Sequence, residues 1–188
     1  KVKLPQKSKR DRECLEYITL VLENLKGIFV LNPIPKAMRD YVRITDTQIK
    51  ENGENISPVL YELCKDDKKE EVLLDVICSL PENEVGGIEF IIVDAKRLSD
   101  GTLRCIAIVA AILSIPENGI LVVEEIDNGI HPRRVNVLID RLSQLGELRN
   151  IDIILTTHNP VLLNKYDKDK LLGVSVVYRD KEKGVSKF

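Results

Sequence analysis

Two carboxylates directly follow an apolar segment of this chain, and their position makes them candidates for metal and proton chemistry. The segment Ile120–Val123 is entirely apolar, and Glu124 and Glu125 come next. Since Mg²⁺ prefers oxygen ligands, one carboxylate at such a position is able to hold it, while its neighbour orients an attacking water. A strand that simply ends in solvated charge is the alternative interpretation of this segment by itself.

The residues after the two acids favour the functional interpretation. Asn128 and Gly129 indicate a tight turn, and His131 with Pro132 then opens a helix, because proline suits the first helical position. A strand, a turn and a helix in this order bring polar groups to the carboxyl edge of a parallel sheet. Open α/β sheets bind their ligands at that edge.

A histidine follows the next apolar segment along the chain. Residues 151–155 form this segment, and His158 lies shortly beyond it. At the same sheet edge as Glu124 and Glu125, its imidazole is able to contact a γ-phosphate or the attacking water. A histidine with a purely structural role is the alternative. Asn159, which stands before a proline, is expected to start the next helix.

Four residues upstream of the acids are candidates for binding an anion. Ser99, Asp100, Gly101 and Thr102 open a predicted helix, with Ser99 as its N-cap. The free N–H groups and the positive dipole end of a helix favour a bound anion. Gly101 also allows a ligand to approach the backbone closely. An ordinary N-cap without a ligand is the alternative.

Alternating strands and helices are expected to position these motifs. The apolar strands imply an α/β fold with a mostly parallel sheet flanked by helices, and a small helical region ahead of Ser99. Helices are predicted at residues 12–26, 57–64, 70–80, 102–113 and 132–148. Strands are predicted at residues 28–31, 88–93, 120–123, 151–155 and 174–178.

The composition is that of an ordinary globular chain, long enough at 188 residues for one domain or one domain with a small appendage. Its net charge of −2 provides no basic field for nucleic acid. The Lys/Arg-rich residues 1–12 could contact phosphates, with a solvated tail as the alternative. No apolar run reaches the roughly 18 residues of a membrane span, and no signal peptide is visible.

The four cysteines are irregularly spaced and form no CxxC pair. This spacing argues against a zinc site, and the apolar sequence neighbours of each cysteine favour reduced thiols in the core of a cytoplasmic protein.

Taken together, the motifs resemble those of the ABC-type AAA ATPases, the group that includes SMC-like proteins and the overcoming-lysogenization-defect family. The ABC signature, Walker B, the D-loop and the switch-histidine segment are matched by residues 98–104 (LSDGTLR), 122–125 (VVEE), 129–132 (GIHP) and 157–159 (THN). The linking region of bacterial defence ATPases is matched by residues 32–39, 52–56 and 59–60. The resemblance divides the chain into a helical linking region at residues 1–97 and an ATPase core at residues 98–188.

The chain departs from the family pattern at two places. Glu124 replaces the usual aspartate of Walker B, and the phosphate-cradling loop GxxxxGK[ST] is absent. Because the chain begins at Lys1 and its single methionine is Met38, we expect a piece of a longer protein. Either omitted residues or a short insertion is expected near residues 81–97.

The resemblance implies a head-to-tail homodimer, or a higher homo-oligomer, with ATP and Mg²⁺ at its interface. Within one subunit, Glu124 would hold the metal, Glu125 would be the catalytic base and His158 would contact the γ-phosphate. The nucleotide bound by the opposite subunit would meet Ser99, Asp100, Gly101 and Thr102. The D-loop residues that cross the interface would be Asn128, Gly129 and His131.

Dimers of this kind pass their nucleotide state to an effector, which in this branch is commonly a nuclease, as in Septu-like anti-phage systems. The resemblance therefore implies a cytoplasmic ATPase of low turnover that gates a nuclease partner in defence or DNA processing. Such a protein could contact DNA or RNA, and no membrane contact is expected.

Two alternatives stay open. One is a nucleotide-binding scaffold that does not hydrolyse ATP. The other is an SMC-like DNA repair ATPase, whose long heptad arms are not visible in this sequence. A transporter ATPase is less favoured, because nothing in the chain resembles the transporter Q-loop context.

Overall fold

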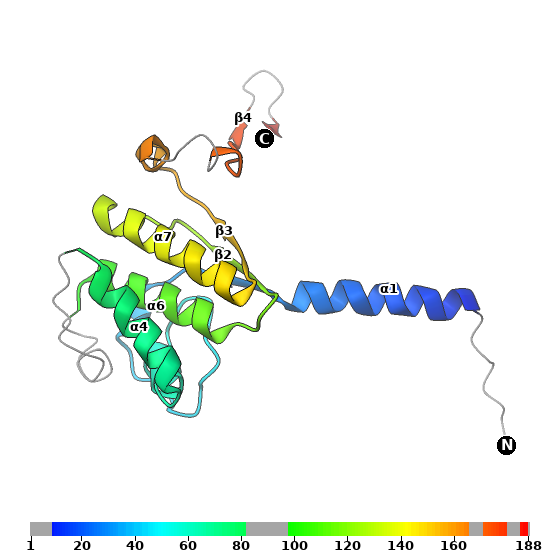
Figure 1. Cartoon of the computed structure of the whole chain (residues 1–188), viewed down its shortest axis with the longest axis horizontal. Coiled ribbons are helices and arrows are strands. Elements are labelled where there is room, and N and C mark those ends of the chain that lie inside the picture. The colour runs from blue at the N-terminus through cyan, green and yellow to red at the C-terminus, as the bar shows by residue number, and fades with distance from the viewer. Residues whose placement is uncertain (1–8, 82–97, 166–170, 180–184, 188) are drawn as a thin grey trace. The chain divides into compact units, whose positions relative to one another are not determined.

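The structure is a computed structural model that describes residues 9–81, 98–165, 171–179 and 185–187. The chain divides into two compact units, Lys1–Thr157 and His158–Phe188. The first unit holds a parallel sheet and the long helices, and the second holds short elements only (Figure 1).

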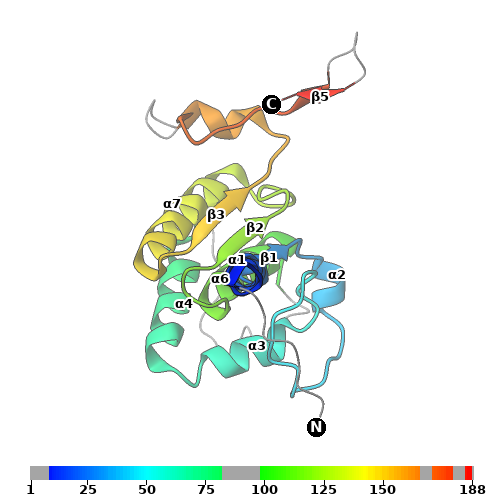
Figure 2. The same cartoon turned by 90° about the vertical axis from the view of Figure 1, so that its right-hand side faces the viewer.

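A three-stranded parallel sheet lies at the centre of the first unit. Its strands are β1 (Ile28–Leu31), β2 (Ile120–Val123) and β3 (Asp152–Leu155), in the spatial order β1-β2-β3 (Figure 2). Leu121 and Val123 of the middle strand are fully buried, as expected for a strand covered by helices. Three of the predicted strands and the parallel α/β fold are therefore confirmed.

The helix α6 (Asp100–Ser114) provides much of the core. Every residue from Gly101 to Leu113 except Arg104 is buried, and the helix contacts β2 and four other helices. These helices are α2 (Pro35–Met38), α3 (Ile56–Leu63), α4 (Asp67–Ser79) and α7 (Pro132–Arg149), the last of which also packs against β3 (Figure 2). The predicted helices that correspond to α3, α4, α6 and α7 are confirmed, with boundary shifts of a few residues, whereas no helix was predicted at α2.

Local signals explain why these helices could be located from sequence. The Asp66 side chain accepts a hydrogen bond from the backbone of Lys68 at the start of α4. Pro132 occupies the first position of α7, and Asn150 ends that helix in the left-handed region with φ +53°. Such signals act over a few residues, so they do not require the tertiary structure.

The first helix, α1 (Lys9–Lys26), confirms the helix predicted at residues 12–26. Its apolar side chains Leu15, Ile18, Leu22 and Leu25 recur with 3-4-3 spacing, and each is between 42% and 57% exposed. The helix therefore has an apolar stripe that the described residues leave largely open to solvent. Within the described ranges, no helix is long and apolar enough to cross a membrane.

The second unit begins with a short helical segment. The 3-10 helix η2 (Pro160–Lys165) starts after Asn159, whose Oδ1 accepts a hydrogen bond from the backbone of Val161 at 3.0 Å. The start of a helix at Asn159 is thus confirmed, although the helix is of the 3-10 type.

The strand predicted at residues 174–178 is wrong. Only Tyr178 of that range joins a strand, β4 (Tyr178–Arg179), which pairs antiparallel with β5 (Ser186–Lys187) in a separate sheet. Val176 and Val177 are 65% and 68% exposed, and in the described part of the chain no strand pairs with them. An apolar run forms a strand only where a partner strand accepts its hydrogen bonds. The strand predicted at residues 88–93 lies outside the described residues.

Candidate functional site

The parallel register brings the carboxyl ends of the three strands to one edge of the sheet. Leu31 pairs with Val123, and Val123 pairs with Leu155, so all three strands end at the same level. The backbone of Glu124 donates to the Leu31 carbonyl at 2.9 Å, and that of Thr156 donates to the Val123 carbonyl at 3.0 Å. The residues that follow the strands are therefore neighbours at this edge.

The first of the two acids, Glu124, is paired with an asparagine at the end of β1. The Asn32 side-chain amide donates to Glu124 Oε2 at 3.1 Å, and the Glu124 carboxylate is exposed. Asn32 is not among the site residues predicted from the sequence, where it falls only within residues 32–39 of the matched linking region. The available signal was that Asn32 follows its strand directly, as Glu124 follows β2.

The second acid, Glu125, has an unusual backbone conformation. Its φ of +48° lies in the left-handed region, which costs a residue with a side chain about 1–3 kcal/mol. Its backbone N–H donates to Thr156 Oγ1 at 3.0 Å, and the Asn128 side-chain amide donates to its Oε2 at 3.1 Å. These two contacts hold Glu125 in place. Because the backbone turns at this residue, Glu125 and Glu124 do not continue one extended strand.

The turn between β2 and α7 is closed by its own hydrogen bonds. The Asn128 N–H donates to the Glu125 carbonyl at 2.9 Å, and Gly129 adopts a left-handed φ of +69°. The Thr157 hydroxyl donates to Asp127 Oδ1 at 2.6 Å, which ties the turn to the end of β3. His131 is the N-cap of α7, and its Nδ1 accepts from the backbone of Arg133 at 3.3 Å. The predicted turn into a proline-led helix is confirmed.

The predicted anion-binding turn lies beside this turn. Ser99 is the N-cap of α6, and its Oγ accepts from the Thr102 backbone at 3.2 Å. A Cβ atom at Gly101 would lie 2.6 Å from the carbonyl oxygen of Gly129. The sequence predicts that Gly101 allows a ligand to approach the backbone, whereas in the structure the chain's own backbone fills that space.

Two arginines that sequence reasoning did not select hold the start of α6. Arg39 Nη2 donates to the Leu98 carbonyl at 2.8 Å and forms an ion pair with Asp100 Oδ1 at 2.6 Å. Arg134 Nη1 donates to Thr102 Oγ1 at 2.9 Å. No local pattern could have identified these contacts, because the partners are brought together only by helix packing.

A further cation lies one helical turn into α6. Burial lowers the pKa of the Arg104 guanidinium, and the nearby carboxylates of Glu125 and Asp100 act in the opposite direction. Glu125 therefore lies within electrostatic reach of the helix that carries the Ser99–Thr102 turn.

His158 is the first residue of the second unit, directly after Thr157, and its side chain is exposed. The first unit thus brings together Glu124, Glu125 and the residues of the two turns, and His158 belongs to the other unit. Its contact with a phosphate stays a prediction from sequence.

The oxygen-rich edge fits a magnesium ion that arrives with a nucleotide. Among the described residues, no group of three or more His, Cys, Asp and Glu side chains could hold a metal by itself. Mg²⁺ usually takes one or two carboxylates and completes its shell with substrate phosphates and water. The exposed carboxylate of Glu124, held by the Asn32 amide, provides such a donor.

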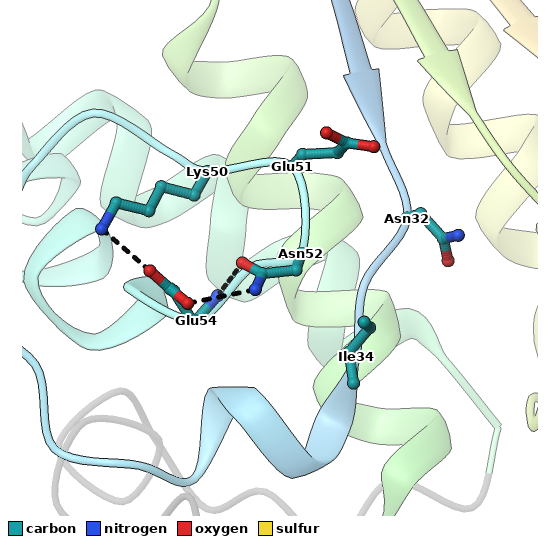
Figure 3. Close-up of a pocket in the computed structure, with 6 residues that line it drawn as sticks. All are labelled: Asn32, Ile34, Lys50, Glu51, Asn52 and Glu54. Atoms are coloured by element: carbon teal, nitrogen blue, oxygen red, sulfur yellow. Dashed lines mark hydrogen bonds and ion pairs between the residues drawn. The ribbon is translucent and has the colours of Figure 1, made fainter.

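A polar pocket of about 430 Å³ lies next to Asn32 (Figure 3). It is lined by Asn32, Ile34, Lys50, Glu51, Asn52 and Glu54. Its lysine is engaged already, because the ammonium group of Lys50 lies 2.6 Å from Asp46 Oδ2 and 2.9 Å from Glu54 Oε1. Lys50 is therefore not a free cation that could bind a phosphate in this pocket.

The cysteines differ in environment. Cys105 is buried, Cys64 is half-buried, and Cys14 and Cys78 are exposed; all four are free thiols. The expectation of core thiols is correct for Cys105 and wrong for the two exposed residues, because apolar sequence neighbours do not decide which side of a helix a residue occupies.

Comparisons with known proteins match most of this chain to one family model. A family model described as "AAA domain, putative AbiEii toxin, Type IV TA system" matches residues 29–164. The methionine import ATP-binding protein MetN of Chlamydia abortus (strain DSM 27085 / S26/3) is 36% identical over 70 residues, which are 37% of this chain and 20% of that protein. No solved structure matches the chain.

Proposed function

Because the chain belongs to the AAA domain family described as a putative AbiEii toxin of type IV toxin–antitoxin systems, we propose that it supplies part of an ATP-hydrolysing site. The observation that carries the proposal is the pair Glu124–Glu125 at the carboxyl edge of the sheet, held by Asn32 and Asn128. ATP binding is also the property named in the description of the methionine import relative, which this chain matches over a fifth of that protein's length.

Each acid has its own role in the proposal. Glu124 would hold Mg²⁺, which would supply positive charge beside the phosphates of a bound ATP. Glu125 orients a water molecule toward the γ-phosphorus and accepts its proton as the water oxygen bonds to phosphorus and ADP leaves. Asn128 restricts the Glu125 carboxylate to one direction through its hydrogen bond. His158 contacts the γ-phosphate in this scheme.

A second subunit supplies further parts of the site in this proposal. The phosphate-cradling loop GxxxxGK[ST] is not found among these 188 residues. Two subunits associate head to tail. Ser99 and Asp100 are exposed, whereas Gly101 and Thr102 are buried, so contact with the neighbour's nucleotide falls first to Ser99. The turn that contains Asn128, Gly129 and His131 crosses the interface.

The proposed biological setting is a defence system. The family description names a toxin of a toxin–antitoxin system, which favours a role in which nucleotide state controls a harmful effector. We propose a nuclease partner for this role, acting on DNA or RNA, with the linking region at residues 1–97 and the ATPase core at residues 98–188 as the parts that transmit the nucleotide state.

A nucleotide-binding scaffold without hydrolysis is the second candidate. In this case ATP would hold the effector inactive and phosphate release would be negligible.

The Glu125→Gln substitution in the full-length protein separates these functions. For an ATPase we expect a loss of phosphate release of at least about 100-fold, typical for removal of a general base, with MgATP binding retained. Glu117→Gln, an exposed acid on the loop before β2, is the matched control. Equal turnover in Glu125→Gln and wild type would contradict the assigned base, and MgATP binding without phosphate release over hours in the wild type would favour the scaffold.

A further inference from the structure

A short chain of hydrogen bonds links α7 to the turn that opens α6. Arg134 Nη1 lies 2.9 Å from Thr102 Oγ1, and Thr102 Oγ1 lies 2.8 Å from Ser99 Oγ. Arg134 is itself fixed, because its Nε donates to the Pro81 carbonyl at 2.7 Å. The guanidinium of a residue just after the D-loop turn thus contacts the buried hydroxyl next to the exposed Ser99.

The donor and the acceptor in each of these hydrogen bonds follow from the donors and acceptors that the three side chains have. Arginine only donates, so Thr102 Oγ1 accepts from Arg134. Thr102 is 7% exposed, and within the described part of the molecule Ser99 Oγ is the acceptor that its hydroxyl hydrogen can reach. If Ser99 donated instead, Thr102 Oγ1 would accept from both Arg134 and Ser99, and its own hydroxyl hydrogen would have no acceptor. An unsatisfied buried donor of this kind costs free energy.

The favoured direction therefore runs from Arg134 to Thr102 and from Thr102 to Ser99. In this arrangement Ser99 Oγ accepts from both the hydroxyl and the backbone N–H of Thr102. Its own hydroxyl hydrogen then remains available to a ligand outside the protein. A cationic donor at the start of the chain polarises each following hydroxyl, which makes Ser99 a better donor.

We propose that Arg134 is a positioning residue that acts through Thr102 and directs the Ser99 hydroxyl hydrogen toward the γ-phosphate of the neighbouring subunit's ATP. This inference rests on the proposed function and adds a role for a residue outside the predicted motifs. It also connects the helix after the D-loop to the turn that serves the other nucleotide.

The test uses substitutions that remove the hydrogen bonds and keep the shape of the side chains. In the full-length protein, Arg134→Met and Thr102→Val should each lower kcat for ATP hydrolysis about tenfold, as expected for loss of one charge-assisted hydrogen bond. MgATP binding to the separate subunit should change less than about twofold, because its own phosphate contacts are elsewhere. Thr102→Ser keeps the hydroxyl and should restore most of the activity.

The double variant tests whether Arg134 acts through Thr102. Arg134→Met combined with Thr102→Val should be no slower than Thr102→Val alone. Thr102→Val already breaks the hydrogen-bond series from Arg134 to Ser99, so the loss of Arg134 should have no further effect. Arg133→Met, which changes the exposed neighbouring arginine, is the matched control and should have wild-type kcat. A purely structural role would instead lower the melting temperature and give additive losses, and additive losses would overturn the proposal.

The remaining outcomes are also decisive. Wild-type kcat in folded Thr102→Val overturns the inference while leaving the proposed ATPase intact. If Arg134→Met fails to fold because its bond to the Pro81 carbonyl is lost, the Thr102 variants alone carry the test. A wild-type protein that neither binds nor hydrolyses ATP overturns the proposed function, and this inference with it, before any variant is compared.

Discussion

Gly101 and Gly129 approach each other so closely that a Cβ atom at residue 101 would lie 2.6 Å from the carbonyl oxygen of Gly129. The contact joins the first turn of α6 to the turn that follows β2. Glu125 is hydrogen-bonded to the same turn through Asn128, so a shift of the α6 turn would also displace the turn that holds Glu125. The two motifs that would serve different nucleotides in a dimer are therefore in direct contact within one subunit.

Replacement of Gly101 by alanine should destabilise the protein by about 1–3 kcal/mol, because the added methyl group must displace backbone rather than a flexible side chain. Chemical denaturation of the purified variants measures this loss. Gly129→Ala is the comparison, since no atom lies within 4 Å of its Cβ position and its cost is limited to a left-handed backbone, about 1 kcal/mol. A Gly101→Ala variant as stable as wild type would show that the turns are not in firm contact.

Removal of the Asn32 amide should weaken the binding of the Mg²⁺ that supports ATP hydrolysis. In Asn32→Ala the carboxylate of Glu124 loses its hydrogen-bond donor and is no longer held in one orientation. We expect the Mg²⁺ concentration for half-maximal ATP hydrolysis to rise about tenfold, the lower end of the effect of losing a ligand-orienting residue. Asn52→Ala, which alters the neighbouring pocket, is the control. Identical magnesium titrations of the Asn32 variant and wild type would rule out this positioning role.

Arg39 should matter chiefly through the charge of Asp100. Without the ion pair, an unpaired carboxylate would stand on the turn that is proposed to approach a polyphosphate, and like charges repel. Arg39→Met should therefore weaken ATP-driven dimerisation, measured by sedimentation, and Arg39→Met with Asp100→Asn should recover it. Lys36→Met, an exposed lysine of α2, is the matched control. If the double variant dimerises no better than Arg39→Met, repulsion is not the cause.

Stability at alkaline pH should depend on Cys105. Burial raises the pKa of this thiol from its ordinary value of 9.0 to about 12. Because the folded state keeps the proton longer than the unfolded state, the stabilisation is complete below pH 9 and is lost as the pH rises toward 12. Wild type should lose up to about 1.4 kcal/mol more per pH unit in this window than Cys105→Ala. Urea denaturation at several pH values measures the two slopes, and parallel slopes would contradict a buried, protonated thiol.

Much of the fold and part of the site could be predicted from the sequence. The strands β1, β2 and β3 and the helices α6 and α7 follow from apolar periodicity and from helix-start signals, such as Ser99 as a cap and Pro132 at the first position of α7. The acids Glu124 and Glu125 could be selected because they directly follow a strand. The prediction of a strand at residues 174–178 was wrong, because a strand also requires a partner strand, which a local apolar pattern does not reveal.

The sequence by itself determined the elements and the two acids, because apolar periodicity, capping and turn formation depend on residues a few positions apart. The tertiary structure alone decided which groups meet: Asn32 with Glu124, 92 positions away, and Arg134 with Thr102, 32 positions away. It also decided that Gly101 faces the carbonyl of Gly129. These contacts depend on strand order and helix packing, which arise from burial of the whole apolar core and leave no local trace in the chain.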